Sequence, residues 1–402
     1  GLSVSDATGN FGPTTKALAP DIPYSATGNS KRNYQGQYYS NSAITNFIEL
    51  LQFALFINGF GDGNFNGVFS SRTQKDVRDF QQHYALPVTG RVDITTWMSL
   101  LISSGNPERS AKAADCATIL NAAKAQTLYN NGYRYIGRYL TGTYGGGISK
   151  ALTVEEANII LNAGLRFFPI YQTSANSESY FTPSKGTSDA IAAITAANNL
   201  GLPKDTIIYF AVDFDAMDYQ ITDSVIPYFE NVYEEVRTSG FKVGIYGARN
   251  VCSRVSDAGY ACSSFVGDMS TGFSGNLGFK IPDNWAFSQF ANLEGSNALG
   301  SGDGLIEIDK DAFSGRDQGV GKLNKIVKKA IYVLPGYMGS KLYKSDGSLF
   351  FVDGTTENYL TFASAQNLGL FEDMAKNAFN RHSSIGVLNS DGSGSKLYAD
   401  PS

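Results

Sequence analysis

The sequence predicts an α/β protein whose largest part is a (β/α)8-like TIM barrel, with a three-helix domain before it and a partial α/β segment after it. Strand patterns that alternate with helix patterns across residues 113–318 predict the barrel. Helical apolar stripes within residues 41–105 predict the three-helix domain. The last segment, residues 319–402, contains an apolar strand that runs into a Pro-Gly turn.

The composition limits the functions that we expect. With 402 residues, of which 42% are hydrophobic, the chain can bury large cores and should divide into two or three domains. The formal net charge of -5 supplies no basic stripe, so nucleic acid is not an expected partner. No run approaches 18 apolar residues, so no transmembrane segment is expected. The histidines, His83 and His382, and the three cysteines lack metal-ligand spacing, so we expect neither a metal nor a cofactor.

A short repeat marks the N-terminal region. The stretch "GNFGPTTKALA" from Gly9 and the stretch "GVFSSRTQKDV" from Gly67 share a glycine, an aromatic residue, a threonine and an apolar residue at equal spacing. The first copy keeps only the latter half of the unit. We therefore expect residues 1–22 to be the remnant of a first repeat, residues 23–40 to be a linker, and the chain to begin inside a domain.

Residues 41–105 contain the complete second unit. Its first helix carries an apolar stripe of Phe47, Leu50, Leu51, Phe53, Ala54 and Leu55. The segments "LLQFALFINGF", "NGVFSSRTQKDVRDFQ" and "TGRVDITTWMSLL", in this order, resemble the three-helix peptidoglycan-binding domain. The resemblance implies peptidoglycan as a partner. The polar stretch 103–112 predicts a boundary, so that this domain should fold separately from the barrel.

The predicted barrel has eight strand segments. They lie at residues 113–116, 133–140, 165–172, 206–215, 242–247, 263–269, 285–291 and 306–313. Helical patterns lie between several of them, and Thr153 with Glu156 predicts a capping box at the start of one helix.

Polar side chains gather at the C-terminal ends of these strands, where barrel enzymes place their catalytic groups. The stretch "IIYFAVDFDA" ends on Asp213 and Asp215, which strand alternation places on one face. Asp311 lies beside Asp309 in the last strand. The alternative is that single acids cap helices or pair with arginines. The candidate site residues are Asp115, Tyr171, Gln172, Asp213, Asp215, Tyr246, Arg249, Asp268, Gln289 and Asp309.

Residues 113–318 resemble a bacterial glycoside-hydrolase-like domain, a relative of the family-twenty-five lysozymes. The segments that carry the resemblance are "DCATILNAAKAQTLYNNGYRYIGRYLTG", "AGLRFFPIYQ", "IIYFAVDFDAMD", "GIYGARNVC" and "NWAFSQF". The resemblance implies muramidase-like cleavage of peptidoglycan outside the cell or in the cell wall. It matches Asp115 to a first-strand acid, Asp213 and Asp215 to an acidic pair, and Asp309 to a last-strand acid. Those lysozymes carry Asp-x-Glu where this chain has Asp-x-Asp.

Glycoside cleavage needs an acid and a second charge-stabilising group. The residue pattern makes Asp215 the expected acid and an ionised Asp213 the second group, with Asp115 and Asp309 as alternatives for the second carboxylate. Tyr171, Gln172, Tyr246, Arg249, Asp268 and Gln289 are the expected substrate-binding residues. Because the glutamate is missing, a non-catalytic wall-binding protein with a degenerate barrel remains the alternative.

The segment 319–402 contains "KKAIYVLPGYMGSKLY", which resembles the first strand and oxyanion loop of lipases of the lecithin-cholesterol acyltransferase type. No Gly-x-Ser-x-Gly nucleophile elbow follows it. The segment is therefore either the start of a longer lipase domain, which would make the chain a fragment of a bifunctional wall hydrolase and lipase, or a plain strand and turn.

Overall fold

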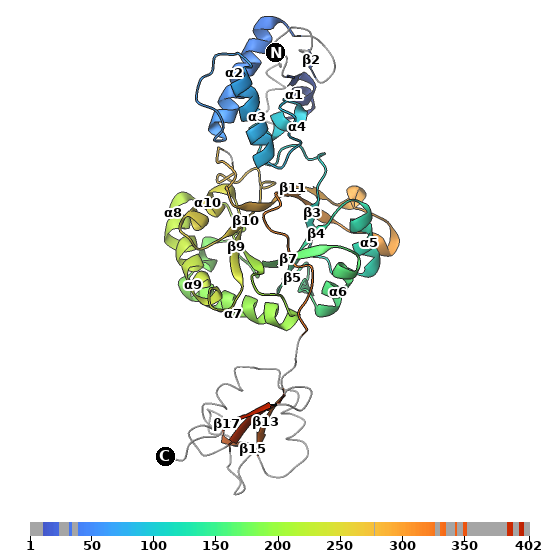
Figure 1. The fold of residues 1–402 in the computed structure, drawn as a ribbon, viewed down its shortest axis with the longest axis vertical. Coiled ribbons are helices and arrows are strands. Elements are labelled where there is room, and N and C mark those ends of the chain that lie inside the picture. Colours follow the sequence, from blue (N-terminus) through green and yellow to red (C-terminus); the bar gives the residue numbers. More distant parts are fainter. Residues whose placement is uncertain are drawn as a thin grey trace. The chain divides into compact units, whose positions relative to one another are not determined.

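The chain forms two compact units, residues 1–324 and residues 325–402 (Figure 1). The computed structural model describes residues 11–23, 32–33, 39–276 and 278–325, together with five short strands between residues 330 and 397. Among these residues, no helix has the length and the apolar character that a membrane crossing requires.

Capped helices build the N-terminal part of the first unit. It contains α1 (Pro13–Leu18), β1 (Pro20–Asp21), β2 (Arg32–Asn33), α2 (Asn41–Ile57), α3 (Ser71–His83) and α4 (Ile94–Leu101). The side chains of Ser40, Ser70 and Asp93 cap α2, α3 and α4 by accepting hydrogen bonds from backbone N–H groups in each first turn. The indole of Trp97 donates to the carbonyl of Pro20, so the segment that the sequence marks as a repeat remnant packs onto these helices.

Helix α2 is apolar on more than one face, which differs from the single buried stripe that the sequence predicts. Leu51, Ala54 and Leu55 are buried in the core. Leu50 and Phe53, which belong to the predicted stripe, are exposed instead. Residues one or two positions apart on a helix do not share a face, so these two side chains turn away from the core.

The second part of the first unit is a closed barrel. Its strands are β3 (Ala113–Asp115), β4 (Tyr135–Tyr139), β7 (Arg166–Tyr171), β8 (Ile207–Ala211), β9 (Lys242–Gly247), β10 (Ser263–Val266), β11 (Trp285–Leu293) and β12 (Ile308–Phe313). The order around the barrel is β10-β11-β12-β3-β4-β7-β8-β9. Figure 1 shows the helices of this part on the outside of the ring.

One strand departs from a regular (β/α)8 barrel. Strand β12 runs antiparallel to both neighbours, β11 and β3, whereas the other neighbouring pairs are parallel. The β11–β12 connection holds no long helix: it contains the short 3₁₀ turns η4 (Gly295–Asn297) and η5 (Gly302–Gly304) and an isolated bridge between Leu299 and Ile306. A parallel return needs a crossover, usually a helix, so this connection brings β12 back in the opposite direction.

The barrel helices are α5 (Ala122–Asn130), α6 (Val154–Asn162), α7 (Pro183–Leu200), α8 (Asp218–Gln220), α9 (Ile226–Val236) and α10 (Arg249–Asp257), with a π-helical turn, η3 (Ile221–Val225), before α9. A small hairpin, β5 (Thr143–Tyr144) and β6 (Ile148–Ser149), follows β4. The predicted capping box is only half formed. Thr153 accepts from the N–H of Glu156, but the Glu156 carboxylate bonds to Arg138 and to the N–H of Leu120 instead of returning to Thr153.

Aromatic rings pack together inside the barrel. The rings of Phe168 and Phe287 stack with their centroids 3.8 Å apart, and Tyr209 and Phe265 lie against them edge to face. This packing requires a glycine at Gly137 in β4. A Cβ atom there would lie 2.7 Å from the Cβ of Asp115 and 2.7 Å from ring atoms of Phe168.

We therefore expect Gly137→Ala to lower the free energy of unfolding by about 1–3 kcal/mol, because the added methyl group overpacks a closed interior. Urea-induced unfolding measures this change. Gly272→Ala is the matched control, since a Cβ at Gly272 meets no atom within 4 Å. Equal stability of the two variants would show that the barrel interior accommodates the extra volume.

The second unit is described by its strands alone. Strands β13 (Ala330–Leu334), β16 (Ser384–Leu388) and β17 (Gly394–Leu397) form an antiparallel sheet in the order β13-β16-β17. Strands β14 (Leu342–Tyr343) and β15 (Leu349–Phe351) form a separate pair. The predicted apolar strand is present as β13, whereas the predicted oxyanion loop after it, and His382, lie outside the described residues.

Candidate functional site

Four of the predicted site residues meet at one end of the barrel. The amide of Gln289 donates from Nε2 to Oδ2 of Asp115 over 2.9 Å and to Oδ2 of Asp309 over 3.1 Å. Its Oε1 accepts from the hydroxyl of Tyr246 over 2.9 Å. Gln289 thus holds two carboxyl groups and one phenol in a single hydrogen-bonded group.

The reversed direction of β12 explains why Asp309 joins this group. Asp115 is the last residue of β3, and Asp309 pairs with it in the β3–β12 register. Asp309 lies near the start of β12, and because this strand runs antiparallel, its start lies at the same end of the barrel as the C-terminal end of β3.

Burial raises the pKa values of these acids. The pKa of Asp115 is well above its usual range because the side chain is buried and because the charge of Asp309 lies close to it. Burial, together with the charge of Glu294, raises the pKa of Asp309 to about 6. Asp309 is only partly buried, whereas Asp115 is buried. Asp309 is therefore the carboxyl group of this pair that an incoming ligand reaches more easily.

A third carboxyl group, Asp311, lies below this pair. It is fully buried, and neither of its side-chain oxygens has a hydrogen-bond partner of ordinary geometry within the part of the chain that the structure describes. Burial first, and then the charges of Asp115 and Asp309, raise its pKa well above the usual range. The sequence places Asp311 beside Asp309 but assigns it no role. The structure encloses this carboxyl group beneath the site.

A second polar group contains Asp213. The amide of Gln172 donates from Nε2 to Oδ2 of Asp213 over 3.0 Å and accepts at Oε1 from the ammonium of Lys150 over 3.1 Å. The Lys150 nitrogen also lies 3.7 Å from the ring centroid of Tyr139. Burial lowers the pKa of Lys150 to about 8, and the charge of Asp213 partly opposes that effect.

The two polar groups lie within electrostatic reach of each other. Burial raises the pKa of Tyr246, and the charges of both Asp213 and Asp115 raise it further. Burial also raises the pKa of Tyr139, and the charges of Asp115, Asp309 and Asp213 raise it further. The mouth of the barrel therefore brings three carboxyl groups near two phenols.

The sequence missed Lys150 and Tyr139. Tyr139 ends β4, so the rule that selected other strand ends would have found it. Lys150 follows the glycine-rich hairpin β5–β6 and carries no motif that points to the site.

Asp215 lies apart from these two groups. Strand β8 ends at Ala211, so strand alternation does not extend to Asp213 and Asp215. Oδ1 of Asp215 accepts from the N–H of Ser274 over 2.7 Å and from its hydroxyl over 2.8 Å. No hydrogen bond connects it to Asp213 among the described residues, and its contacts hold the loop around Ser274.

Tyr171 points away from the barrel interior. Phe168 and Ile170 of β7 face the interior cluster, so Tyr171, one position later, faces the surrounding helices. Its hydroxyl donates to Oδ1 of Asp189 in α7 over 2.9 Å.

Arg249 and Asp268 form a buried ion pair at the edge of the barrel. The distance from Nε of Arg249 to Oδ1 of Asp268 is 2.6 Å. Nη2 of Arg249 also donates to the carbonyl of Ser103 over 3.0 Å, and Nη1 lies 3.4 Å from the hydroxyl of Tyr84. These partners belong to the predicted boundary stretch and to the end of α3, so the pair joins the N-terminal helices to the barrel.

Metal ligands do not gather at the site. Across the described ranges, no set of three or more histidine, cysteine, aspartate or glutamate side chains is arranged to hold a metal ion. Cys116, Cys252 and Cys262 are all free thiols.

The chain matches two family models. Residues 126–313 match the model of the Rv2525c-like, glycoside hydrolase-like domain, and residues 45–100 match a peptidoglycan binding domain. Neither match reaches residues 319–402, so the lipase-like interpretation of that segment has no support from them.

The chain is also similar to individual proteins. It is 47% identical over 336 residues to the uncharacterized protein YbfG of Bacillus subtilis (strain 168), a match that covers 81% of this chain and 43% of YbfG. The chain thus spans less than half the length of that relative.

Two solved structures are similar in part. The Tat-secreted protein Rv2525c of Mycobacterium tuberculosis is 17% identical, with a TM-score of 0.44 over 53% of this chain and 99% of that chain. A family 25 glycosyl hydrolase from Bacillus anthracis is 15% identical, with a TM-score of 0.32 over 51% of this chain and 89% of that chain. The family models thus show a peptidoglycan binding domain over residues 45–100, followed by a glycoside hydrolase-like domain, similar to the Rv2525c-like family, over residues 126–313.

Proposed function

We propose that this protein is a cell-wall glycoside hydrolase, muramidase-like, that cleaves the glycan strands of peptidoglycan while its N-terminal helical domain holds the polymer. The observation that carries the proposal is the pair of carboxyl groups, buried Asp115 and partly buried Asp309, which Gln289 bridges at the mouth of the barrel. The matches to a glycoside hydrolase-like domain and a peptidoglycan binding domain support it. The barrel is then a (β/α)8 barrel in which one strand is reversed, preceded by a three-helix binding domain.

Asp309 is the proposed proton donor. A general acid works best when its pKa lies near the working pH, and burial raises the pKa of Asp309 to about 6. The residue pattern gave this role to Asp215. Two hydrogen bonds from Ser274 occupy Asp215, whereas Asp309 lies at the mouth beside a second carboxyl group, so the geometry favours Asp309.

Asp213 is the proposed anionic group. Cleavage of a glycosidic bond develops positive charge at the anomeric carbon, and a carboxylate stabilises that charge, either directly or by orienting the 2-acetamido group of the substrate. Gln172 positions Asp213 by donating to Oδ2, and Lys150 in turn holds Gln172. Asp115 is buried behind Asp309, and burial together with the charge of Asp309 holds the pKa of Asp115 well above its usual range.

The same proposal places the protein outside the cell or in the cell wall of a bacterium. Peptidoglycan is found there, and the match of residues 45–100 to a peptidoglycan binding domain supports this location.

One observation favours a second candidate function, in which the barrel binds glycan without cleaving it. The Asp-x-Asp pair replaces Asp-x-Glu, and its second carboxylate, Asp215, is engaged by Ser274. In this candidate function, the hydrogen bonds from Ser274 keep Asp215 from the acid role that the residue pattern gives it. A protein of this kind would bind peptidoglycan and release no reducing ends.

The pH dependence of cleavage tests the role of Asp309. The donor is active only when protonated, so release of new reducing ends from purified peptidoglycan should be fully present well below pH 6 and should fall as the pH rises through about 6. Initial rates between pH 4 and pH 8 measure the profile. A rate that rises through this range would contradict the assignment of Asp309 as the acid.

A further inference from the structure

The outward face of α2 and the loop after it carry an apolar surface that the core does not use. Between 40% and 57% of each of these side chains is exposed: Leu50, Phe53, Phe56, Ile57, Phe65 and Val68. A helix on the surface of a protein normally presents polar residues to water. An exposed group of large apolar side chains marks an interaction site.

Three of these side chains form a phenyl cluster, which we define as Phe53, Phe56 and Phe65. The ring of Phe65 lies edge to face against both others, with centroid distances of 5.6 Å to Phe53 and 5.7 Å to Phe56. The loop that carries Phe65 is pressed against the helix, because a Cβ on Gly63 would lie 3.4 Å from the Phe56 ring. The rings are therefore held in a defined arrangement while they face solvent.

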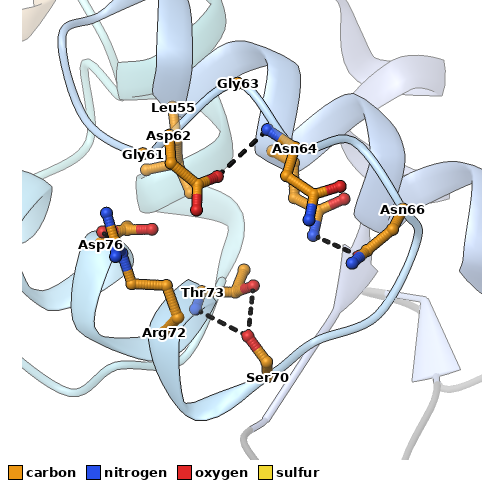
Figure 2. Close-up of a pocket in the computed structure, with 11 residues that line it drawn as sticks. Leu55, Gly61, Asp62, Gly63, Asn64, Asn66, Ser70, Arg72, Thr73 and Asp76 are labelled. Carbon is orange, nitrogen blue, oxygen red and sulfur yellow. Dashed lines mark hydrogen bonds and ion pairs between the residues drawn. The ribbon is translucent and has the colours of Figure 1, made fainter.

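A polar pocket of about 110 Å³ adjoins the phenyl cluster. Gly63, which contacts Phe56, also lines this pocket. Figure 2 shows the carboxyl groups of Asp62 and Asp76 and the guanidinium of Arg72 around it, with Asn64 across from them.

Several polar groups in the pocket are open to a ligand. The side-chain amide of Asn64 has no hydrogen-bond partner among the described residues, and Asp62 receives only the N–H of Asn64 there. Asp76 is held by Arg72, with 3.4 Å between Oδ1 and Nε. The pocket therefore presents hydrogen-bond acceptors and one free amide beside an apolar surface.

The charges of the pocket select the kind of ligand. Two carboxylates and one guanidinium leave the pocket net negative, so it repels phosphate-rich polymers and carboxylate-rich peptides. A neutral sugar is not repelled. Its hydroxyl groups donate to carboxylates, its acetamido group bonds to an amide, and the C–H face of its ring packs on a phenyl ring.

A cation fits this pocket less well than a sugar. The loop has Asp62, Asn64 and Asn66 at alternate positions, a spacing that also occurs in calcium-binding loops. However, Oδ1 of Asn66 already accepts from Nε2 of Gln52 and from the N–H of Val68, both over 3.0 Å. Thr73 occupies the position where such loops supply a bidentate glutamate.

We propose that the phenyl cluster and the adjoining pocket form the site at which the N-terminal domain binds the neutral N-acetylated glycan of peptidoglycan. This inference rests on the proposed function, in which that domain holds the polymer, and it assigns the residues and the ligand class. The rings supply the packing surface, and Asp62, Asn64 and Asp76 supply the hydrogen bonds.

The test uses the full chain carrying Asp309→Asn, so that the ligand is not cleaved. Into this chain we introduce Phe53→Ser with Phe65→Ser, and separately Asp62→Ala with Asn64→Ala. The matched control is Val88→Ser, which replaces an exposed apolar residue outside the phenyl cluster and the pocket. Circular dichroism and thermal melts verify folding, which exposed side chains should not affect.

Binding is measured by sedimentation with purified peptidoglycan and by calorimetric titration with soluble N-acetylglucosamine oligomers. We expect both double variants to bind the oligomers at least about ten-fold more weakly than the parent chain, and the control to bind as the parent does. Folded double variants that bind as tightly as the parent would refute the assigned site while leaving the proposed function intact.

Two other outcomes are informative. In a competition experiment, glycan-free stem peptides that displace the parent chain from peptidoglycan, together with oligomers that do not, would refute the glycan as the ligand. A parent chain that does not sediment with peptidoglycan at all would refute both this inference and the anchoring part of the proposed function.

Discussion

Replacement of Asp309 by asparagine is expected to slow the release of reducing ends from peptidoglycan by about 10²- to 10⁴-fold, which is the usual cost of losing general acid catalysis. The asparagine keeps nearly the same shape, and its Oδ1 still accepts from Gln289. The folded structure and the affinity for glycan should therefore be preserved, and initial rates measured below pH 6 should report the loss of the proton alone.

The matched control for this experiment is Asp303→Asn. Asp303 is an exposed aspartate in the same β11–β12 connection, and its side chain takes part in no hydrogen bond among the described residues. The Asp303→Asn variant should release reducing ends at the wild-type rate. Asp215→Asn is the informative comparison, because a greater loss from Asp215→Asn than from Asp309→Asn would return the donor role to Asp215.

The largest expected effect on stability follows from the buried ion pair between strand β4 and helix α6. Arg138 is fully buried, and its Nε lies 2.7 Å from Oε1 of Glu156. The guanidinium also donates to the carbonyls of Cys116 and Lys150, so it supports segments that lead into the mouth of the barrel. Glu156→Gln would leave a buried cation without its counter-charge, and we expect a loss of about 3–5 kcal/mol in the free energy of unfolding.

Urea-induced unfolding measures this loss as a lower midpoint with an unchanged slope. Glu155→Gln is the control, because Glu155 is exposed in the first turn of the same helix and should change stability by less than about 0.5 kcal/mol. A Glu156→Gln variant that unfolds at the wild-type urea concentration would mean that water or another group compensates the charge of Arg138.

Much of the barrel was predictable because its strands are buried on both faces and therefore appear as continuous apolar runs in the sequence. Strand β9 has the predicted bounds, residues 242–247. The direction of β12 was not predictable, because a strand pattern contains no information about direction. The one signal in the sequence for an antiparallel β12 was the connection before it, which lacks a long helix.

The site was predictable where side chains follow a buried strand. Asp115 and Tyr246 lie at or next to the ends of β3 and β9 and meet Gln289 at the mouth, whereas Asp309 joins them only because β12 is reversed. Tyr171 obeys the same rule but faces α7, since its direction depends on the parity of the strand. Arg249 lies in a helix that follows a strand, and its long side chain reaches out to Ser103 instead of the barrel mouth.

Lys150 could not be found from the sequence, because a loop residue is brought to the site only by the fold. The α2 helix shows the opposite case. Its apolar residues predicted a core stripe, yet Leu50 and Phe53 face solvent. Hydrophobicity alone does not distinguish a core position from an apolar binding surface.

The measurement that tests the central claim most directly is reducing-end analysis of purified peptidoglycan after incubation with the wild-type chain at pH 5, followed by mass spectrometry of the soluble fragments. The proposed function predicts new reducing ends that accumulate with time and fragments in which water has been added across a glycosidic bond, with both forming at least about 10²-fold more slowly for Asp309→Asn. Peptidoglycan that binds the wild-type chain but yields no new reducing ends between pH 4 and pH 8 would contradict the assignment of a glycoside hydrolase and would favour the non-catalytic alternative.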